Sequence, residues 1–210
     1  MSRFTPISPR LLAARLAAEL LARQDGSHPL RVALDAPACA ELGPLAEALS
    51  NELRAAGRPV AVLDSRGFYR DASLRFEYGK TDVESFYASW LDIPALQREV
   101  LGPLGAQGGY LPSLRDPVTN RSSRAEIVRL ATEAVLLVTG ELLLGTDLDF
   151  DVTLHFAVSR QARRRLTSEE LRWTLPAFDR YDLEVDPSGL ADAVIRYDDP
   201  AHPALLVRSG

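Results

Sequence analysis

Cysteine and histidine are scarce in this sequence. Cys39 is the single cysteine among 210 residues, which excludes an internal disulfide framework and favours a reducing compartment, with the cytoplasm as the default prediction. The three histidines, His28, His155 and His202, are scattered and lack the spacing of metal ligands. We therefore predict no metal site.

The sequence also lacks an excess of positive charge and a long apolar run. It has 24 basic and 29 acidic residues, for a net charge of −5, so neither nucleic acid nor an anionic membrane surface is a predicted partner. The apolar stretch 11–22 is interrupted by Arg15 and Glu19, which favours an amphipathic helix over a signal peptide or a membrane span. A small-molecule or nucleoside ligand and a homodimer stay open.

The composition is that of a globular protein, with 46% hydrophobic and 25% charged residues. The length predicts a single domain over 1–210, with an N-terminal helical region at 1–28 and a small lid at about 159–180. Apolar segments of strand length alternate with helix-patterned segments. Strands are predicted at 31–35, 60–64, 134–138, 152–157, 193–197 and 204–207, and helices at 9–24, 43–56, 94–101, 159–173 and, in part, 175–186. This alternation predicts an α/β fold with a mostly parallel, doubly wound sheet.

A strand, a tight loop and a helix follow one another over 31–53, as at the start of a nucleotide-binding α/β domain. An intact P-loop, G-x-x-x-x-G-K-[ST], binds phosphates with backbone N–H groups and a lysine, and Mg²⁺ with a hydroxyl. Its eight positions, here called the phosphate loop, are occupied by Ala36, Pro37, Ala38, Cys39, Ala40, Glu41, Leu42 and Gly43. The strand, loop and helix of the motif are present, but the residues that bind phosphate and Mg²⁺ in the motif are absent.

Several further stretches occur in a consistent order: VALDAP, GRPVAVLDSRGFYR, YGKTDVESFYASWLDIPALQREVLGPLG, YLPSLRDPVTN, VLLVTGELLL and RYDLEVDPSGLADAVIRYDDPAHPAL. Over residues 30–207 the chain resembles the uridine-kinase-like branch of P-loop kinases, close to phosphoribulokinase-type nucleoside kinases. The resemblance implies a P-loop kinase fold with a small lid. It also implies transfer of the γ-phosphoryl group of ATP, with Mg²⁺, to a hydroxyl of a nucleoside or similar molecule.

The chain departs from this family where the chemistry is carried out. Glu41 replaces a glycine and Leu42 the lysine, and one charge pair at about 4 Å is worth about 4 kcal/mol at an effective dielectric constant of about 20. The family places a catalytic Asp where this chain has Arg66, and arginine is no general base at neutral pH. Asp64 precedes it by two residues. Thr139 replaces an acidic residue, and Glu141 is close enough to take over part of that role.

Other residues are candidates for ligand contact. Arg163 and Arg164 resemble the lid arginines that bind phosphates in these kinases; a solvated helix face balanced by Glu169 and Glu170 is an equally weighted alternative. The resemblance also implies acceptor contacts. The candidates on the acceptor side are Phe68, Tyr69, Tyr110, Arg115 and Asp116.

The leading functional hypothesis is a non-catalytic relative of uridine kinase that acts as a binding or interaction module and needs no cofactor. The alternative is an active nucleoside or small-molecule kinase that uses ATP and Mg²⁺ with an unusual phosphate loop. A third hypothesis is a small-metabolite sensor that keeps the acceptor pocket and has lost ATP.

Overall fold

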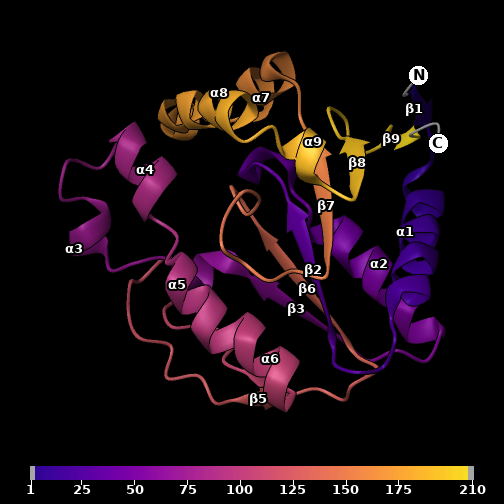
Figure 1. Ribbon diagram of the computed structural model, residues 1–210. Coiled ribbons are helices and arrows are strands. Elements are labelled where there is room, and N and C mark those ends of the chain that lie inside the picture. The colour runs from indigo at the N-terminus through magenta and orange to yellow at the C-terminus, as the bar shows by residue number, and fades with distance from the viewer. Residues whose placement is uncertain (1–2, 208–210) are drawn as a thin grey trace.

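A seven-stranded sheet forms the centre of the computed structural model, which describes residues 3–207 (Figure 1). Its strand order is β1-β9-β8-β7-β2-β6-β3. The five strands from β8 to β3 are parallel, and β9 and β1 add an antiparallel edge. The strands are β1 Arg3–Pro6, β2 Leu30–Asp35, β3 Val60–Asp64, β6 Val135–Gly140, β7 Val152–Ala157, β8 Ala193–Arg196 and β9 Ala204–Val207.

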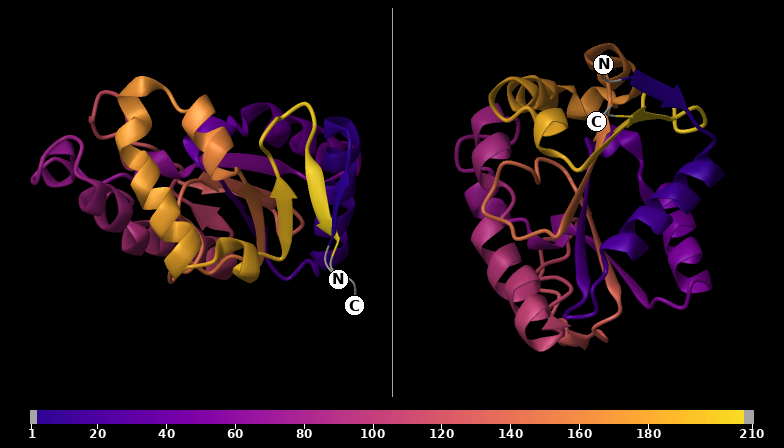
Figure 2. Two further views of the ribbon diagram at one scale, coloured as in Figure 1. Left: turned by 90° about the horizontal axis from the view of Figure 1, so that it is seen from above. Right: turned by 45° about the vertical axis from the view of Figure 1, so that its right-hand side comes forward.

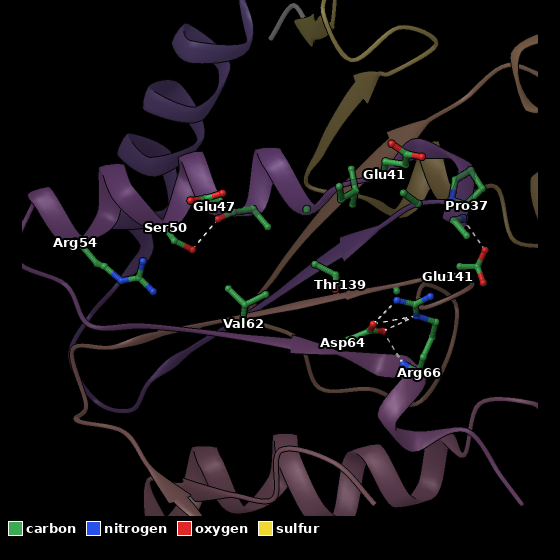
Figure 3. A pocket seen from close by; sticks show the side chains of 16 residues that line it. Pro37, Glu41, Glu47, Ser50, Arg54, Val62, Asp64, Arg66, Thr139 and Glu141 are labelled. Atoms are coloured by element: carbon green, nitrogen blue, oxygen red, sulfur yellow. Dashed lines mark hydrogen bonds and ion pairs between the residues drawn. The ribbon is translucent and has the colours of Figure 1, made fainter. Parts of the chain in front are cut away.

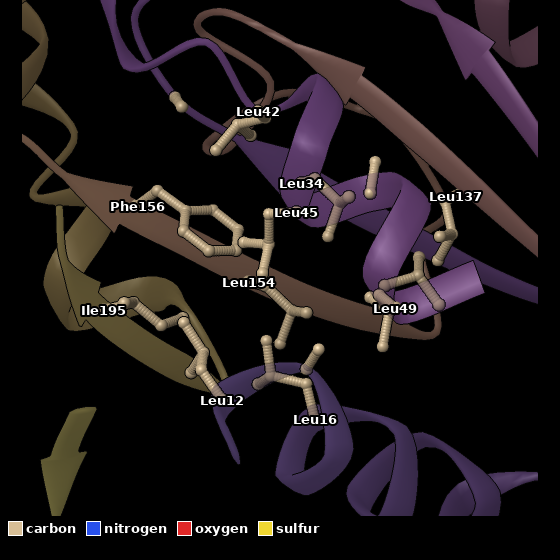
Figure 4. Close-up of a cluster of buried hydrophobic side chains, with 14 of the residues drawn as sticks. Leu12, Leu16, Leu34, Leu42, Leu45, Leu49, Leu137, Leu154, Phe156 and Ile195 are labelled. Carbon is tan, nitrogen blue, oxygen red and sulfur yellow. The ribbon is translucent and has the colours of Figure 1, made fainter. Parts of the chain in front are cut away.

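Helices α1 (Pro9–Arg23) and α2 (Gly43–Ala55) cover one face of the sheet (Figure 2). The side chain of Ser8 caps α1 by accepting a hydrogen bond from the Leu11 amide at 3.3 Å. Leucines recur on the inner faces of both helices and are fully or almost fully buried against β2 and β7 (Figure 4). They are Leu12, Leu16, Leu20, Leu45, Leu49 and Leu53.

Helices α5 (Ile93–Leu96) and α6 (Gly102–Gln107) lie on the opposite face and are joined by a π-helical turn at Gln97–Leu101. Leu96, Leu101 and Leu104 are fully buried there. The prediction of a helix over 94–101 is confirmed, but its predicted end at Gly102-Pro103 is wrong. Pro103 lies in the first turn of α6, where a missing backbone N–H leaves no hydrogen bond unmade.

The remaining helices gather above the carboxyl ends of the strands (Figure 1). A short hairpin, β4 (Gly109–Tyr110) with β5 (Val128–Arg129), lies apart from the main sheet. The upper helices are α3 Ala72–Arg75, α4 Val83–Ser89, α7 Arg160–Leu166, a 3₁₀ helix at Glu169–Thr174, α8 Leu175–Glu184 and α9 Pro187–Leu190. The segment predicted as a lid, 159–180, thus comprises α7, the 3₁₀ helix and the first half of α8, and we call it the lid.

The predicted α/β class and the mostly parallel sheet are confirmed. Strand β1 was not predicted, because its four residues are mostly exposed and carry no apolar pattern. The predicted domain limits, 1–210, include residues 1, 2 and 208–210, which lie outside the described residues. No helix within residues 3–207 is long and apolar enough to cross a membrane.

Candidate functional site

The phosphate loop connects the carboxyl end of the central strand β2 to the first turn of α2. The Ala36 amide donates to the carbonyl of Gly140 at 2.9 Å, which fixes the start of the loop beside β6. A 3₁₀ turn follows at Ala38–Ala40, and Glu41 then has a left-handed backbone conformation with φ of 48°. Glycine adopts this conformation without strain, and glycine is what the motif has at this position.

Leu42 turns its side chain into the core. It is 8% exposed and belongs to the same buried cluster as Leu45 and Phe156 (Figure 4). Ala36 and Ala40 are buried in the same cluster, and Cys39 packs against it half-buried. Burial raises the pKa of the Cys39 thiol. The position that carries the phosphate-binding lysine in the motif is therefore part of the hydrophobic core.

A carboxylate of the chain itself occupies a donor of the phosphate loop. Glu141, just after β6, accepts a hydrogen bond from the Ala38 amide on Oε1 at 2.6 Å (Figure 3). Its Oε2 accepts a weaker one from the Tyr69 hydroxyl at 3.3 Å. Burial raises the pKa of Glu141, and the hydrogen bond from Ala38 opposes that shift. A carboxylate oxygen is thus bound to the Ala38 N–H, one of the backbone donors that bind phosphate in the motif.

Asp64 and Arg66 bind each other at the end of β3. The Arg66 guanidinium donates through Nη2 to Asp64 Oδ2 at 2.6 Å and through Nε to the same oxygen at 2.9 Å. The Asp64 carboxylate also accepts from the Arg66 amide, and the pair raises the pKa of Arg66. Both side chains line an open cavity of about 580 Å³ between the phosphate loop, α2 and β3, with Glu47 and Arg54 (Figure 3).

A second cavity, about 460 Å³ in volume, lies between the phosphate loop and the lid, and we call it the aromatic cavity. Its rings pack mostly edge to face, with centroids 5.2 Å apart for Phe86 and Trp90 and 5.5 Å for Phe86 and Trp173. Tyr69 joins at 5.8 Å from Trp90, and Phe178 at 6.0 Å from Phe86. Such geometry stabilises the cluster and leaves flat apolar surfaces for a ligand.

Solved structures with the same architecture include proteins whose descriptions name kinases. The chain superposes on a structure described as a possible uridine kinase from Bacillus stearothermophilus with a TM-score of 0.73, at 20% identity, covering 88% of this chain and 97% of the other. A protein described as a "putative fructose transport system kinase" from Silicibacter sp. TM1040 gives a TM-score of 0.58, 22% identity, and coverage of 81% of this chain and 88% of the other. The chain has the P-loop kinase fold. No family model and no curated protein matches the sequence.

Within this P-loop kinase fold, the predicted acceptor residues divide into two groups. Tyr69 lines the aromatic cavity. Phe68, in the 3₁₀ turn after β3, and Tyr110, at the end of β4, are buried in the core beneath the sheet, away from the cavities described here. Arg115 forms an ion pair with Asp71 at 3.1 Å, and Asp116 accepts the amides of the turn that follows it. These two residues shape the turn 116–120, whose Pro117 and Val118 reach the cavity.

The two lid arginines also differ. Arg163 is 5% exposed and lines the aromatic cavity, and its Nη2 donates to Asp179 at 3.0 Å and to Asp182. Arg164, the next residue, is exposed. Within residues 3–207, no group of three or more His, Cys, Asp or Glu side chains is arranged to hold a metal ion.

A buried network of hydrogen bonds around Asp35 holds together the segments that surround the site. Asp35, the last residue of β2, accepts the Leu143 amide at 2.9 Å, and its carboxylate contacts His155 Nδ1 at 2.7 Å. The Tyr181 hydroxyl donates to the same carboxylate at 3.2 Å and accepts the Leu144 amide at 2.8 Å. Four segments, β2, β7, α8 and the loop after β6, are thereby held together.

Sequence reasoning missed several side chains of the site, among them an arginine and two aromatic residues of the lid. Arg75, Trp173 and Phe178 all line the aromatic cavity. Trp173 and Phe178 lie in the lid five residues apart, and no spacing in the sequence links them to Phe86 or Trp90. Arg75 sits at the end of the short helix α3, in a stretch that the sequence shows only as rich in charge and aromatics.

Proposed function

We propose that this protein is a non-catalytic relative of the uridine-kinase-like proteins, which binds a small organic molecule in the aromatic cavity and has no ATP site. The observation that carries the proposal is the contact of Glu141 with the Ala38 amide at 2.6 Å. A phosphate group and this carboxylate would compete for the same backbone donor. The loop offers no lysine in exchange, because Leu42 is buried in the core.

The charges around the loop argue in the same direction. Glu41, Glu47, Asp64 and Glu141 all line the cavity beside it, and of the two arginines there, Arg66 is already paired with Asp64. A triphosphate entering this cavity would meet a surplus of negative charge at short range. The triphosphate of ATP would therefore be repelled from the loop.

The two candidates for the base, Asp64 and Arg66, are engaged with each other. Asp64 has both carboxylate oxygens engaged by Arg66, and Arg66 keeps its proton at neutral pH. Transfer of a phosphoryl group depends on positioning and charge neutralisation. With neither at the loop, and with Asp64 and Arg66 engaged with each other, binding in the aromatic cavity is the activity that the site supports best.

Calorimetry with ATP–Mg²⁺ and thermal-shift measurements with nucleosides, nucleotides and aromatic metabolites test this proposal. We expect ATP–Mg²⁺ to give neither heat nor a change in melting temperature, and at least one small organic molecule to raise it, because a ligand of the native state stabilises that state. In the Trp173→Ala variant, the rise in melting temperature with that organic molecule should be smaller. A micromolar dissociation constant for ATP with transfer of its γ-phosphoryl group would overturn the proposal in favour of an active kinase.

A further inference from the structure

Arg75 is a buried cation in the wall of the aromatic cavity. The residue is 6% exposed, and its Nε donates to the backbone carbonyl of Arg70 at 2.9 Å. Within residues 3–207 no carboxylate forms an ion pair with it, and Asp71, whose charge acts on Arg75 from a distance, is paired with Arg115. Burial accordingly lowers the pKa of Arg75. A buried charge without a counter-ion is rare, since desolvation costs more than weak contacts return.

Aromatic rings supply only part of the missing stabilisation. The guanidinium carbon of Arg75 lies 4.8 Å from the centroid of Phe76, 4.9 Å from that of Trp90 and 5.5 Å from that of Tyr69. These faces attract the cation but accept no conventional hydrogen bonds. Among side chains of residues 3–207, Arg163 Nε is the one buried polar atom that is both sealed and unpartnered. The Nη groups of Arg75, for which no partner is found, are therefore not sealed, and the residue lines the aromatic cavity.

Arg163 is a second buried arginine in the wall of the cavity, but its charge is already paired. It lines the same cavity from the lid and is 5% exposed. Its Nη2 is bound by Asp179 and Asp182, and its Nε–H points at no acceptor in the described part of the chain. Because its Nε is sealed and its Nη2 is paired with carboxylates, Arg75 is the buried arginine of the cavity whose charge lacks a counter-ion among residues 3–207.

The wall of the cavity carries negative charge on one side. Glu41 and Glu141 line it on the side of the phosphate loop, and an anionic group would be repelled from there. Between the charges lie the rings of Phe86, Trp90 and Trp173, which suit a flat ligand. A volume of about 460 Å³ matches a small organic molecule.

We propose that the ligand of the aromatic cavity is an organic anion, a planar ring that carries one carboxylate or phosphate group, with that group on Arg75 and the ring among the aromatic side chains. This inference rests on the proposed function, because it assigns the chemical class of the molecule that the cavity binds. Carboxylate and phosphate share the recognition chemistry, since a guanidinium donates two parallel hydrogen bonds to either.

Matched pairs of probes separate the charge from the ring. Calorimetry would compare indole-3-acetate with indole-3-acetamide, and uridine monophosphate with uridine. We expect the anion of at least one pair to bind ten-fold or more tightly than its neutral partner. The pair that shows the preference tells whether carboxylate or phosphate is recognised.

Arg75→Gln should remove the preference, bringing the anion-to-neutral ratio close to one while the neutral probe still binds. Arg75→Lys should restore part of it. Arg98→Gln, on an exposed helix surface, is the matched control and should leave the ratio unchanged. If Arg75→Gln does not fold, the Lys variant and the wild-type ratio still decide.

The outcomes distinguish the two proposals. Equal binding of charged and neutral probes, or an unchanged ratio in Arg75→Gln, would overturn the anion assignment and leave a binding protein without ATP. Binding of ATP–Mg²⁺ with phosphoryl transfer would overturn the proposed function itself. Failure of every probe, charged or neutral, would also overturn the anion assignment.

Discussion

Glu41 has a backbone conformation that suits glycine, with φ of 48°. A non-glycine residue there stores about 1 kcal/mol of strain. We expect Glu41→Gly to raise the free energy of unfolding by about 1 kcal/mol, measured by urea denaturation. The same exchange at Glu47, in the middle of α2, is the control and should lower stability by about 1 kcal/mol. A loss of stability in Glu41→Gly would show that its side chain stabilises the loop.

Glu141 gives stability a pH dependence of definite sign. Burial raises its pKa above the usual 4.5, so the folded chain holds the proton more tightly than the unfolded chain. Its contribution to stability is fully present below pH 4.5 and is lost as the pH rises through the folded-state pKa.

Glu141→Gln keeps an oxygen for the Ala38 amide and removes the titration. Relative to wild type, the variant should therefore gain stability progressively as the pH is raised above 4.5. Thermal unfolding between pH 4 and 8 measures the difference, with exposed Glu47→Gln as the reference. A difference that stays constant with pH would contradict the assignment.

At the scale of elements, contacts on two sides hold the phosphate loop in place between β6 and α2. Glu141 binds the loop from one side, and Leu42 anchors it in the core from the other. Restoring the motif with Ala36→Gly, Glu41→Gly, Leu42→Lys and Gly43→Thr therefore leaves a carboxylate on the donor that phosphate needs.

We expect this four-fold variant to show little change in melting temperature with ATP–Mg²⁺, and the same variant with Glu141→Ala to show an increase. Turnover should stay negligible in both, because Arg66 remains at the position of the base. An equal increase in the two variants would mean that Glu141 does not block the site. The wild type and Glu141→Ala alone complete the comparison.

At the scale of the whole molecule, the network around Asp35 joins segments that are far apart in sequence. Asp35→Ala would leave the Leu143 amide, the Tyr181 hydroxyl and the His155 ring without their acceptor in a buried site. We expect a loss of roughly 3 kcal/mol in the free energy of unfolding, measured with urea. Asp35→Asn, which keeps one acceptor oxygen, should cost less. Equal losses would show that charge, and not hydrogen bonding, dominates.

The sheet could be predicted from the sequence because its parallel strands are buried on both faces and read as short apolar runs, as 135–138 does. The aromatic cavity could not, because its wall comes from segments that only tertiary packing brings together. Phe68 and Tyr110 illustrate the limit: both matched an acceptor pattern, and both serve the core. A pattern records residue type and order, whereas the face that a side chain takes depends on its neighbours.

The aromatic cavity contains both tryptophans of the chain, Trp90 beside α4 and Trp173 in the lid. Their ring centroids are 5.5 Å apart and the planes are tilted by 56°, a distance at which two indole transitions couple. The protein therefore carries its own optical reporter: near-ultraviolet circular dichroism and intrinsic emission arise mainly from this one place. Any molecule that enters between the rings, or any displacement of the lid away from α4, would alter both signals without a label.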